Sequence, residues 1–213
     1  MGDPVTSIVR TAGPTFLRRP HGIEWVADVL RVLTLLSIPV ATIVWGPIAF
    51  AVMSLTLFGV IVPRILGLRP GFDVALCLLA LVAGWSSALE WYTSVPGWDK
   101  LIHFLLVGAL AVLVVVIASD LKILPDATRM RVVVAVAVCG TIGLAIGAVW
   151  EMFEWVGHDF LDSTIFVGYD DTIGDLLADG AGAVVVGIVA RWCASDRRTV
   201  EPPVRSWRQS PAV

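Results

Sequence analysis

The sequence predicts an all-α, polytopic membrane protein with about six transmembrane helices. Of its 213 residues, 57% are hydrophobic and only 15% are charged, and the mean hydropathy is +0.86. Apolar runs recur along the whole chain, each near the roughly 20 residues that a helix needs to cross a bilayer. A soluble domain could not expose this much apolar surface, so lipid is the expected solvent.

The apolar runs delimit the expected spans in chain order. They cover residues 25–45, 48–65, 72–91, 101–119, 132–155 and 173–192. Only Gly46-Pro47 separates the first two runs, so residues 25–65 are expected to form a hydrophobic hairpin. If this hairpin re-enters without crossing, the count drops to four, and both termini still lie on one side of the membrane.

Three regions follow from these runs. Residues 1–24 lack the apolar core and cleavage site of a secretory signal, so they are expected to be a cytoplasmic N-terminal arm. Residues 25–193 would form a single six-helix transmembrane domain. The Pro-containing residues 194–213 are predicted to be a disordered cytoplasmic tail.

The basic residues predict the orientation, because cytoplasmic segments are enriched in Lys and Arg. With both termini inside, Lys100 is the basic residue that falls outside. Arg31 lies within the first span, where Asp28 can pair with it and its stem can snorkel toward water. The cytoplasmic segments then hold Arg10, Arg18, Arg19, Arg64, Arg69, Lys122, Arg129, Arg131, Arg191, Arg197, Arg198, Arg205 and Arg208.

Acidic residues gather at the opposite, outer ends of the predicted helices. The preference of Lys and Arg for the cytoplasm does not require this, so the acids need another explanation. Within each group the residues recur every three or four positions, which places them on one helix face. The groups are Asp99 with His103, Glu151 with Glu154 and His158, and Asp171 with Asp175 and Asp179.

Small residues extend two of these faces into the membrane. Such ridges let helices approach closely, so the acids are expected to face neighbouring helices rather than lipid. The ridges are Cys139, Gly143 and Gly147 before Glu151, and Ala183 and Gly187 after Asp179.

Acids at this spacing could form a site for a divalent metal ion. An ionisable group costs about 2.5 to 3.5 kcal/mol at mid-bilayer, so several need protonation, water, histidine partners or a cation. Oxygen with imidazole suits Mn, Fe or Zn, and oxygen alone suits Mg or Ca. The candidate metal ligands are Asp99, His103, Glu151, Glu154, Asp175 and Asp179. Of these, Glu151, Glu154, His103 and Asp179 are the catalytic candidates.

Helix capping is a structural alternative for two of the acids. Thr172 could be an N-cap with Asp175 at the third helical position, and Asp99 could cap the fourth span.

The other candidates have structural alternatives of a different kind. His103 could be a hydrogen-bonded histidine without a metal. Glu151 and Glu154 could form a polar lock between helices.

Three motifs within residues 60–190 resemble a known family. They are WDKLIHF with Gly108, then WEMFEW, then DDTIGDLLADGAG. They resemble the YjdF-type family of small bacterial integral membrane proteins and, more distantly, the VanZ-like family. VanZ-like proteins typically carry Gln where this chain has Glu154, which favours the YjdF type. The resemblance implies a multi-pass protein of the bacterial inner membrane and brings no settled activity.

Three functions fit these features. The first is an extracytoplasmic, metal-assisted site that acts on or binds a lipid head group; the H-E-x-x-H and G-x-S-x-G motifs are absent. The second is a noncatalytic accessory subunit with a membrane-protein partner in a larger envelope or lipid-transport complex. The third is a proton- or cation-coupled carrier. Nucleic-acid binding is not expected, because the Arg-bearing tails are short and fit the topology.

Overall fold

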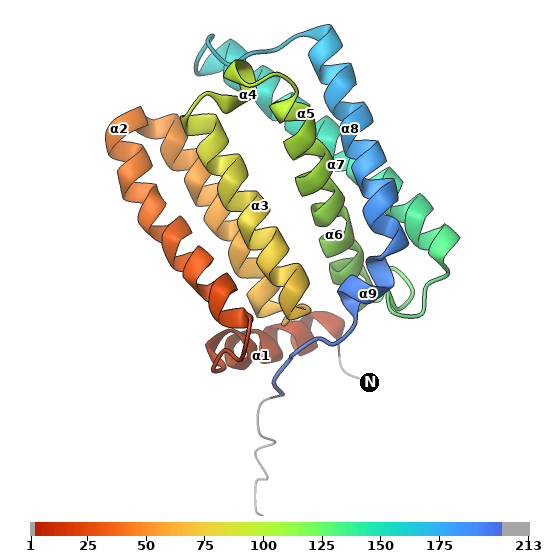
Figure 1. Cartoon of the computed structure of the whole chain (residues 1–213). Coiled ribbons are helices and arrows are strands. Elements are labelled where there is room, and N and C mark those ends of the chain that lie inside the picture. The colour runs from red at the N-terminus through yellow and green to blue at the C-terminus, as the bar shows by residue number, and fades with distance from the viewer. Residues whose placement is uncertain (1–2, 202–213) are drawn as a thin grey trace, which may run out of the picture.

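The computed structural model describes residues 3–201, which fold as a bundle of helices without a β-strand (Figure 1). This confirms the all-α prediction. In chain order the helices are α1 (Pro4–Leu17), α2 (Glu24–Ile65), α3 (Pro70–Ala88), α4 (Trp91–Ser94), α5 (Trp98–Ile102), the π-helical η1 (His103–Val107), α6 (Gly108–Asp120), α7 (Val132–Phe160), α8 (Tyr169–Ile188) and α9 (Ala190–Ala194).

The predicted hairpin is present within α2. Gly46 has φ 81° and ψ −159°, a left-handed conformation that favours glycine, and it interrupts the helical backbone. Pro47 follows and has no N–H for a helical hydrogen bond. Figure 1 shows the result as two limbs that run in opposite directions beside α3.

Four helical segments of the described chain are long and apolar enough to cross a membrane. They are α2, α3, the continuous segment Trp98–Asp120 and α7. Helix α8 runs back along α7 and carries aspartates in its first half (Figure 1). The count of six crossings and the cytoplasmic location of both termini stay predictions.

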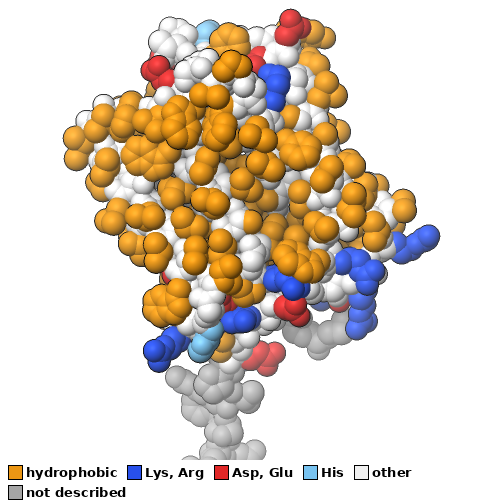
Figure 2. Space-filling view, in the orientation of Figure 1, with side chains coloured by type: hydrophobic (Ala, Val, Ile, Leu, Met, Phe, Trp, Pro, Cys, Tyr) orange, Lys and Arg blue, Asp and Glu red, His pale blue; other side chains and the backbone are white. Residues whose placement is uncertain are grey.

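The molecule has two chemically different ends with an apolar band between them (Figure 2). The end crossed by α1 is called the basic end below, and the end where α7 stops and α8 begins is called the acidic end. Most Lys and Arg side chains in view lie toward the basic end. The core between the ends is built by α3, α6, α7, α8 and α9, with Val112, Val115 and Val116 at its centre.

Buried ion pairs hold α2 and α3 together at the basic end. Arg31 pairs with Asp28 at 2.9 Å, as predicted, and also with Asp73 of α3. Its Nε donates to the carbonyl of Val60, 2.8 Å away. Arg31 does not snorkel, because its guanidinium turns into the bundle and the residue is 7% exposed.

The segment after α9 contacts the basic end as far as Val200. Arg197 forms two hydrogen bonds to Asp120, at 2.7 and 2.8 Å, and also donates to the carbonyl of Leu66. The backbone N–H of Val200 donates to the hydroxyl of Thr15 in α1. These contacts fasten the segment to the basic end; residues 202–213 lie outside the described chain.

Candidate metal site at the acidic end

A histidine and a fully buried aspartate meet at the centre of the acidic end. His103 Nδ1 lies 3.0 Å from Asp179 Oδ1, and the two residues are 7% and 0% exposed. When His103 Nδ1 carries the hydrogen, Asp179 Oδ1 accepts it. In a neutral imidazole this leaves a lone pair on Nε2, which is the atom that a metal ion would bind.

Close helix packing around glycines brings these two side chains together. At Gly182 of α8, an added Cβ would overlap the backbone carbonyl of Phe104, and at Gly108 it would meet the backbone of Gly182. At Gly147 of α7, a Cβ would overlap the Asp179 carboxylate. The small residues therefore place Asp179 between α7 and η1. This confirms the prediction that Asp179 faces neighbouring helices rather than lipid.

The local backbone also positions His103. Gly97, at φ 76°, turns the chain into α5. The helix then widens into the π-helical segment η1, which begins at His103. Such wide turns often mark functional sites, because they shift the side chains that follow around the helix axis.

Three of the predicted ligands form one donor group. One ligand atom each from Asp99, His103 and Asp175 lies within 4.8 Å of the others. The Asp99 carboxylate is 3.7 Å from His103 Nε2, the ring nitrogen that faces away from Asp179. Ligands about 2.1 Å from one ion need a similar or slightly closer spacing, and two carboxylates with an imidazole suit Mn, Fe or Zn.

The buried carboxylates at this end are short of partners. Asp175 is 1% exposed, and its Oδ1 accepts no hydrogen bond. Oδ2 of Asp179 and Oε1 of Glu151 are also buried without a hydrogen-bond partner. Leaving an ionised oxygen unpaired in a low-dielectric interior is unfavourable, so a cation beside Asp175 would stabilise the donor group.

Lys100 is a site residue that sequence reasoning missed. Its Nζ is 3.3 Å from Asp171 and 3.7 Å from Asp175, and its side chain is 46% exposed. The signal was present in the sequence, because Lys100 stands between Asp99 and His103 and is the basic residue of the predicted outer segments. It supplies a positive charge at the edge of the donor group.

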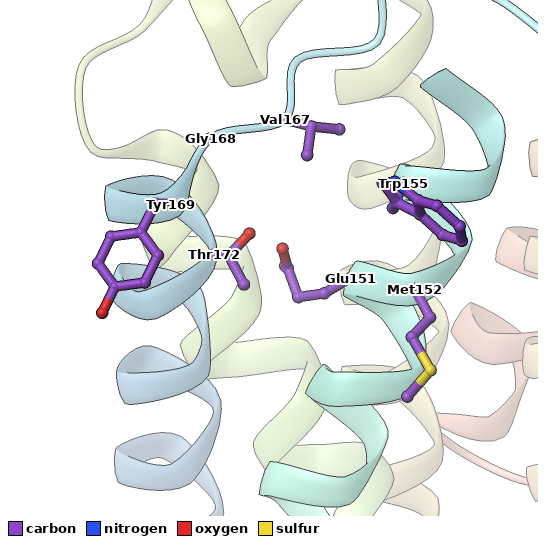
Figure 3. Close-up of a pocket in the computed structure, with 7 residues that line it drawn as sticks. All are labelled: Glu151, Met152, Trp155, Val167, Gly168, Tyr169 and Thr172. Carbon is purple, nitrogen blue, oxygen red and sulfur yellow. The ribbon is translucent and has the colours of Figure 1, made fainter. Parts of the chain in front are cut away.

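The acids of α7 lie apart from the donor group. Glu151 lines a pocket of about 470 Å³ between α7 and α8 (Figure 3). Glu154 accepts a hydrogen bond from Trp150 Nε1 at 2.9 Å. His158 lies on the same helix, as expected, but its Nδ1 hydrogen-bonds the carbonyl of Ile165 at 2.6 Å, which ties down the following loop.

Tyr92 connects the α4 segment to the same end of the bundle. Its hydroxyl donates to the carbonyl of Ala83 at 2.9 Å. Burial, and then the negative charges of Asp99 and Glu154, raise the pKa of the Tyr92 phenol. The phenol therefore stays neutral and serves as a hydrogen-bond donor.

Both capping alternatives are wrong. Helix α8 begins at Tyr169 with Gly168 in the N-cap position, so Thr172 lies inside the helix and Asp175 is far from its start. Helix α5 has Gly97 as its N-cap, and Asp99 makes no cap hydrogen bond. Neither Thr172 nor Asp99 is therefore an N-cap, and Asp99 lies in the first turn of α5.

The comparisons with known proteins give a family. The family model described as "Predicted membrane protein (DUF2238)" matches residues 23–196, which include the whole candidate site. This match confirms the YjdF-type resemblance and gives no support to the VanZ-like one. No curated protein and no solved structure matches the chain.

Proposed function

We propose that this chain, which belongs to the DUF2238 family of predicted membrane proteins, binds a divalent metal ion at the acidic end. The ion would act on a lipid head group. Asp99, His103 and Asp175 would hold the ion, because their donor atoms already lie within 4.8 Å of one another. With both termini in the cytoplasm, as the basic residues predict, the site would face the extracytoplasmic side of the bacterial inner membrane.

The observation that carries the proposal is the pairing of His103 with Asp179. Metal-bound histidines commonly donate their second ring N–H to a carboxylate, which fixes the tautomer and raises the basicity of the ligand. Here Asp179 holds Nδ1 from a fully buried position, while Nε2 faces Asp99. A histidine kept only for packing would not need a carboxylate on each ring nitrogen.

The residues around the ion would have different chemical roles. The ion, when bound, would polarise a phosphate oxygen or activate a water molecule. Lys100 would attract the anionic oxygens of a head group, since its ammonium is half-exposed beside the ligands. Glu151 and Glu154 are the candidate proton acceptors, because they lie on the neighbouring helix face and outside the donor group.

A carrier is less well supported than a single site. Relays usually need polar groups on both sides of the membrane midplane. The buried pairs of Arg31 with Asp28 and Asp73 lie on α2 and α3, whereas the donor group belongs to α5, η1 and α8. Apolar side chains such as those of Val112 and Val115 fill the core between the ends.

An accessory role remains the second proposal, because the described chain has large exposed apolar surfaces that could contact a membrane partner as well as lipid. Co-purification of one membrane partner per chain, with cellular function surviving loss of the metal ligands, would favour it. A function that disappears with the metal would favour the metal site.

Metal content tests the main proposal directly. The chain, purified in detergent, stripped with a chelator and reloaded with Mn²⁺, Fe²⁺, Zn²⁺, Mg²⁺ or Ca²⁺, should retain about one transition-metal ion by elemental mass spectrometry. Asp175→Asn and His103→Ala should each abolish retention. Asp170→Asn is the matched control, because Asp170 lies on the same helix in an exposed position. Full retention in the Asp175→Asn, His103→Ala double variant would refute the site.

A further inference from the structure

The pocket between α7 and α8 is separate from the metal-ligand group and has its own chemistry. Its volume is about 470 Å³, and a single carboxylate, that of Glu151, lies among its lining residues. Figure 3 shows Glu151 and Thr172 pointing toward each other across the pocket, with Trp155 on the α7 side and Tyr169 on the α8 side. The pocket therefore combines one acid and one hydroxyl with aromatic surfaces.

The electrostatics of the pocket select a cation. Oε1 of Glu151 is buried and accepts no hydrogen bond, so it requires a donor. Lys100 cannot be that donor, because its ammonium lies against Asp171 and Asp175 and it does not line the pocket. A free phosphate would be repelled by Glu151, whereas an ammonium group would be attracted.

The surroundings of the pocket point to the lipid layer as the source of that cation. Met152 and Trp155 are 58% and 51% exposed on the outer surface of α7, where a lipid would contact them. Tyr169, 82% exposed, stands at the opposite side. Trp and Tyr side chains concentrate at the level of lipid head groups, so the pocket lies at the depth where a head group would be found.

We propose that this pocket binds the primary ammonium group of a phosphatidylethanolamine-type lipid. A primary ammonium has three N–H donors, which match the unpartnered Glu151 oxygen and the Thr172 hydroxyl. Trp155 and Tyr169 also line the pocket, at its outer edges (Figure 3). A quaternary ammonium has no N–H to donate and would leave Glu151 without a hydrogen bond.

This inference rests on the proposed action on a lipid head group and names the lipid class involved. Its test does not depend on that action. Thr172 lies three residues before Asp175 on α8, so both share one helix face about one turn apart. A lipid whose ammonium reaches Glu151 would thus carry its phosphate close to the metal ligands. The pocket would then determine which lipid class is presented there.

Lipid retention in native mass spectrometry tests the pocket. The full chain is exchanged into nanodiscs that contain phosphatidylethanolamine, phosphatidylcholine or phosphatidylglycerol with the same acyl chains. The wild type should retain phosphatidylethanolamine in preference to the other two. Glu151→Gln should weaken this retention at least about tenfold, as expected for the loss of a buried charge-assisted hydrogen bond. Thr172→Val should weaken it less, and Asp170→Asn should not change it.

Metal content measured on the same samples separates the two proposals. Glu151→Gln should keep its metal and lose the lipid, whereas Asp175→Asn should lose the metal and keep the lipid. Equal retention of the three lipids, or unchanged retention in Glu151→Gln, would overturn the pocket. So would free ethanolamine binding as tightly as the lipid. If Glu151→Gln does not fold, Glu151→Asp serves in its place. We expect this variant to keep the preference for phosphatidylethanolamine but to retain the lipid more weakly than the wild type.

Discussion

Single residues at the acidic end have different roles although their side chains are alike. Asp175 and Asp179 are four residues apart on α8, and both are almost completely buried. Asp175 belongs to the donor group, whereas Asp179 contacts His103 Nδ1, the ring nitrogen that faces away from that group. In the proposed site, Asp179 would therefore position the histidine, and Asp99, His103 and Asp175 would bind the ion.

Asp179→Asn should lower metal affinity roughly 10- to 100-fold without abolishing binding, the usual effect of losing a carboxylate behind a metal-bound histidine. The amide keeps the shape of the side chain but no longer holds the Nδ1–H tautomer as strongly. Calorimetric titration of the chelator-stripped protein measures the change. Asp170→Asn should bind like the wild type, and a total loss of binding in Asp179→Asn would identify Asp179 as a ligand.

At the scale of the elements, the site depends on how closely α8 approaches its neighbours. Gly182 touches the backbone of η1, and Gly147 makes room for the Asp179 carboxylate. The π-helical turn of η1 begins at the residue that must face Asp179. The geometry of the site is thus set by backbone packing, and the side chains of the site complete it.

Gly182→Ala should destabilise the bundle by about 1 to 3 kcal/mol, because the new methyl group would overlap the Phe104 carbonyl and neither backbone can move cheaply. It should also weaken metal binding by separating α8 from His103. Gly59→Ala is the matched control, since an added Cβ there meets nothing within 4 Å. The control should leave stability unchanged or raise it by up to about 1 kcal/mol.

Both variants can be compared by reversible unfolding in mixed micelles. Equal stability of Gly182→Ala and Gly59→Ala would show that the α8 and η1 backbones are not in contact.

The sequence predicted the helices well and the details of their ends poorly. Apolar runs predicted where the long helices lie, and Gly46-Pro47 predicted the break in α2, because hydrophobicity and backbone chemistry act locally. The start of α8 was misplaced, since Thr172 resembles a cap while the helix begins at Tyr169. Neither the π-helical turn nor the pairing of His103 with Asp179 could be predicted, because each depends on contacts between distant segments.

The whole molecule carries charged groups at both ends and an apolar band between them. The ion pairs of Arg31 at the basic end join α2 and α3, whereas the candidate residues of the acidic end lie on α5, η1, α7 and α8. At the basic end Arg64 donates to the carbonyls of Phe16 and Arg18, which fixes the position of α1. One end therefore holds the chain together, and the other provides the candidate site.

Arg31→Met should destabilise the protein by about 3 to 5 kcal/mol, because it leaves the buried Asp73 without its cation. Arg31→Met combined with Asp73→Asn should recover most of this loss, since no unpaired charge remains. Arg129→Met is the surface control; Arg129 is 88% exposed, and its pair with Asp126 should contribute at most about 1 kcal/mol. A double variant no more stable than Arg31→Met would argue against a dominant charge effect.

The predicted orientation can be tested with single cysteines, because Cys77, Cys139 and Cys193 are all buried. A membrane-impermeant maleimide should label Ser163→Cys in intact spheroplasts, since residue 163 lies in the exposed loop between α7 and α8. Ser7→Cys, exposed on α1, should react only after lysis. The reverse pattern would invert the topology, and labelling of both positions in intact cells would contradict the placement of the two ends on opposite sides of the membrane.

The pair between Arg31 and Asp73 also constrains how the protein is made. The two residues are 42 positions apart, so Arg31 leaves the ribosome well before its partner. Until α3 arrives, Arg31 has only Asp28 as a nearby acid, and an arginine within a span opposes insertion by about 2.5 to 3.5 kcal/mol. We therefore expect the α2 hairpin to remain beside the insertion machinery until α3 is synthesised, and to enter the lipid together with it.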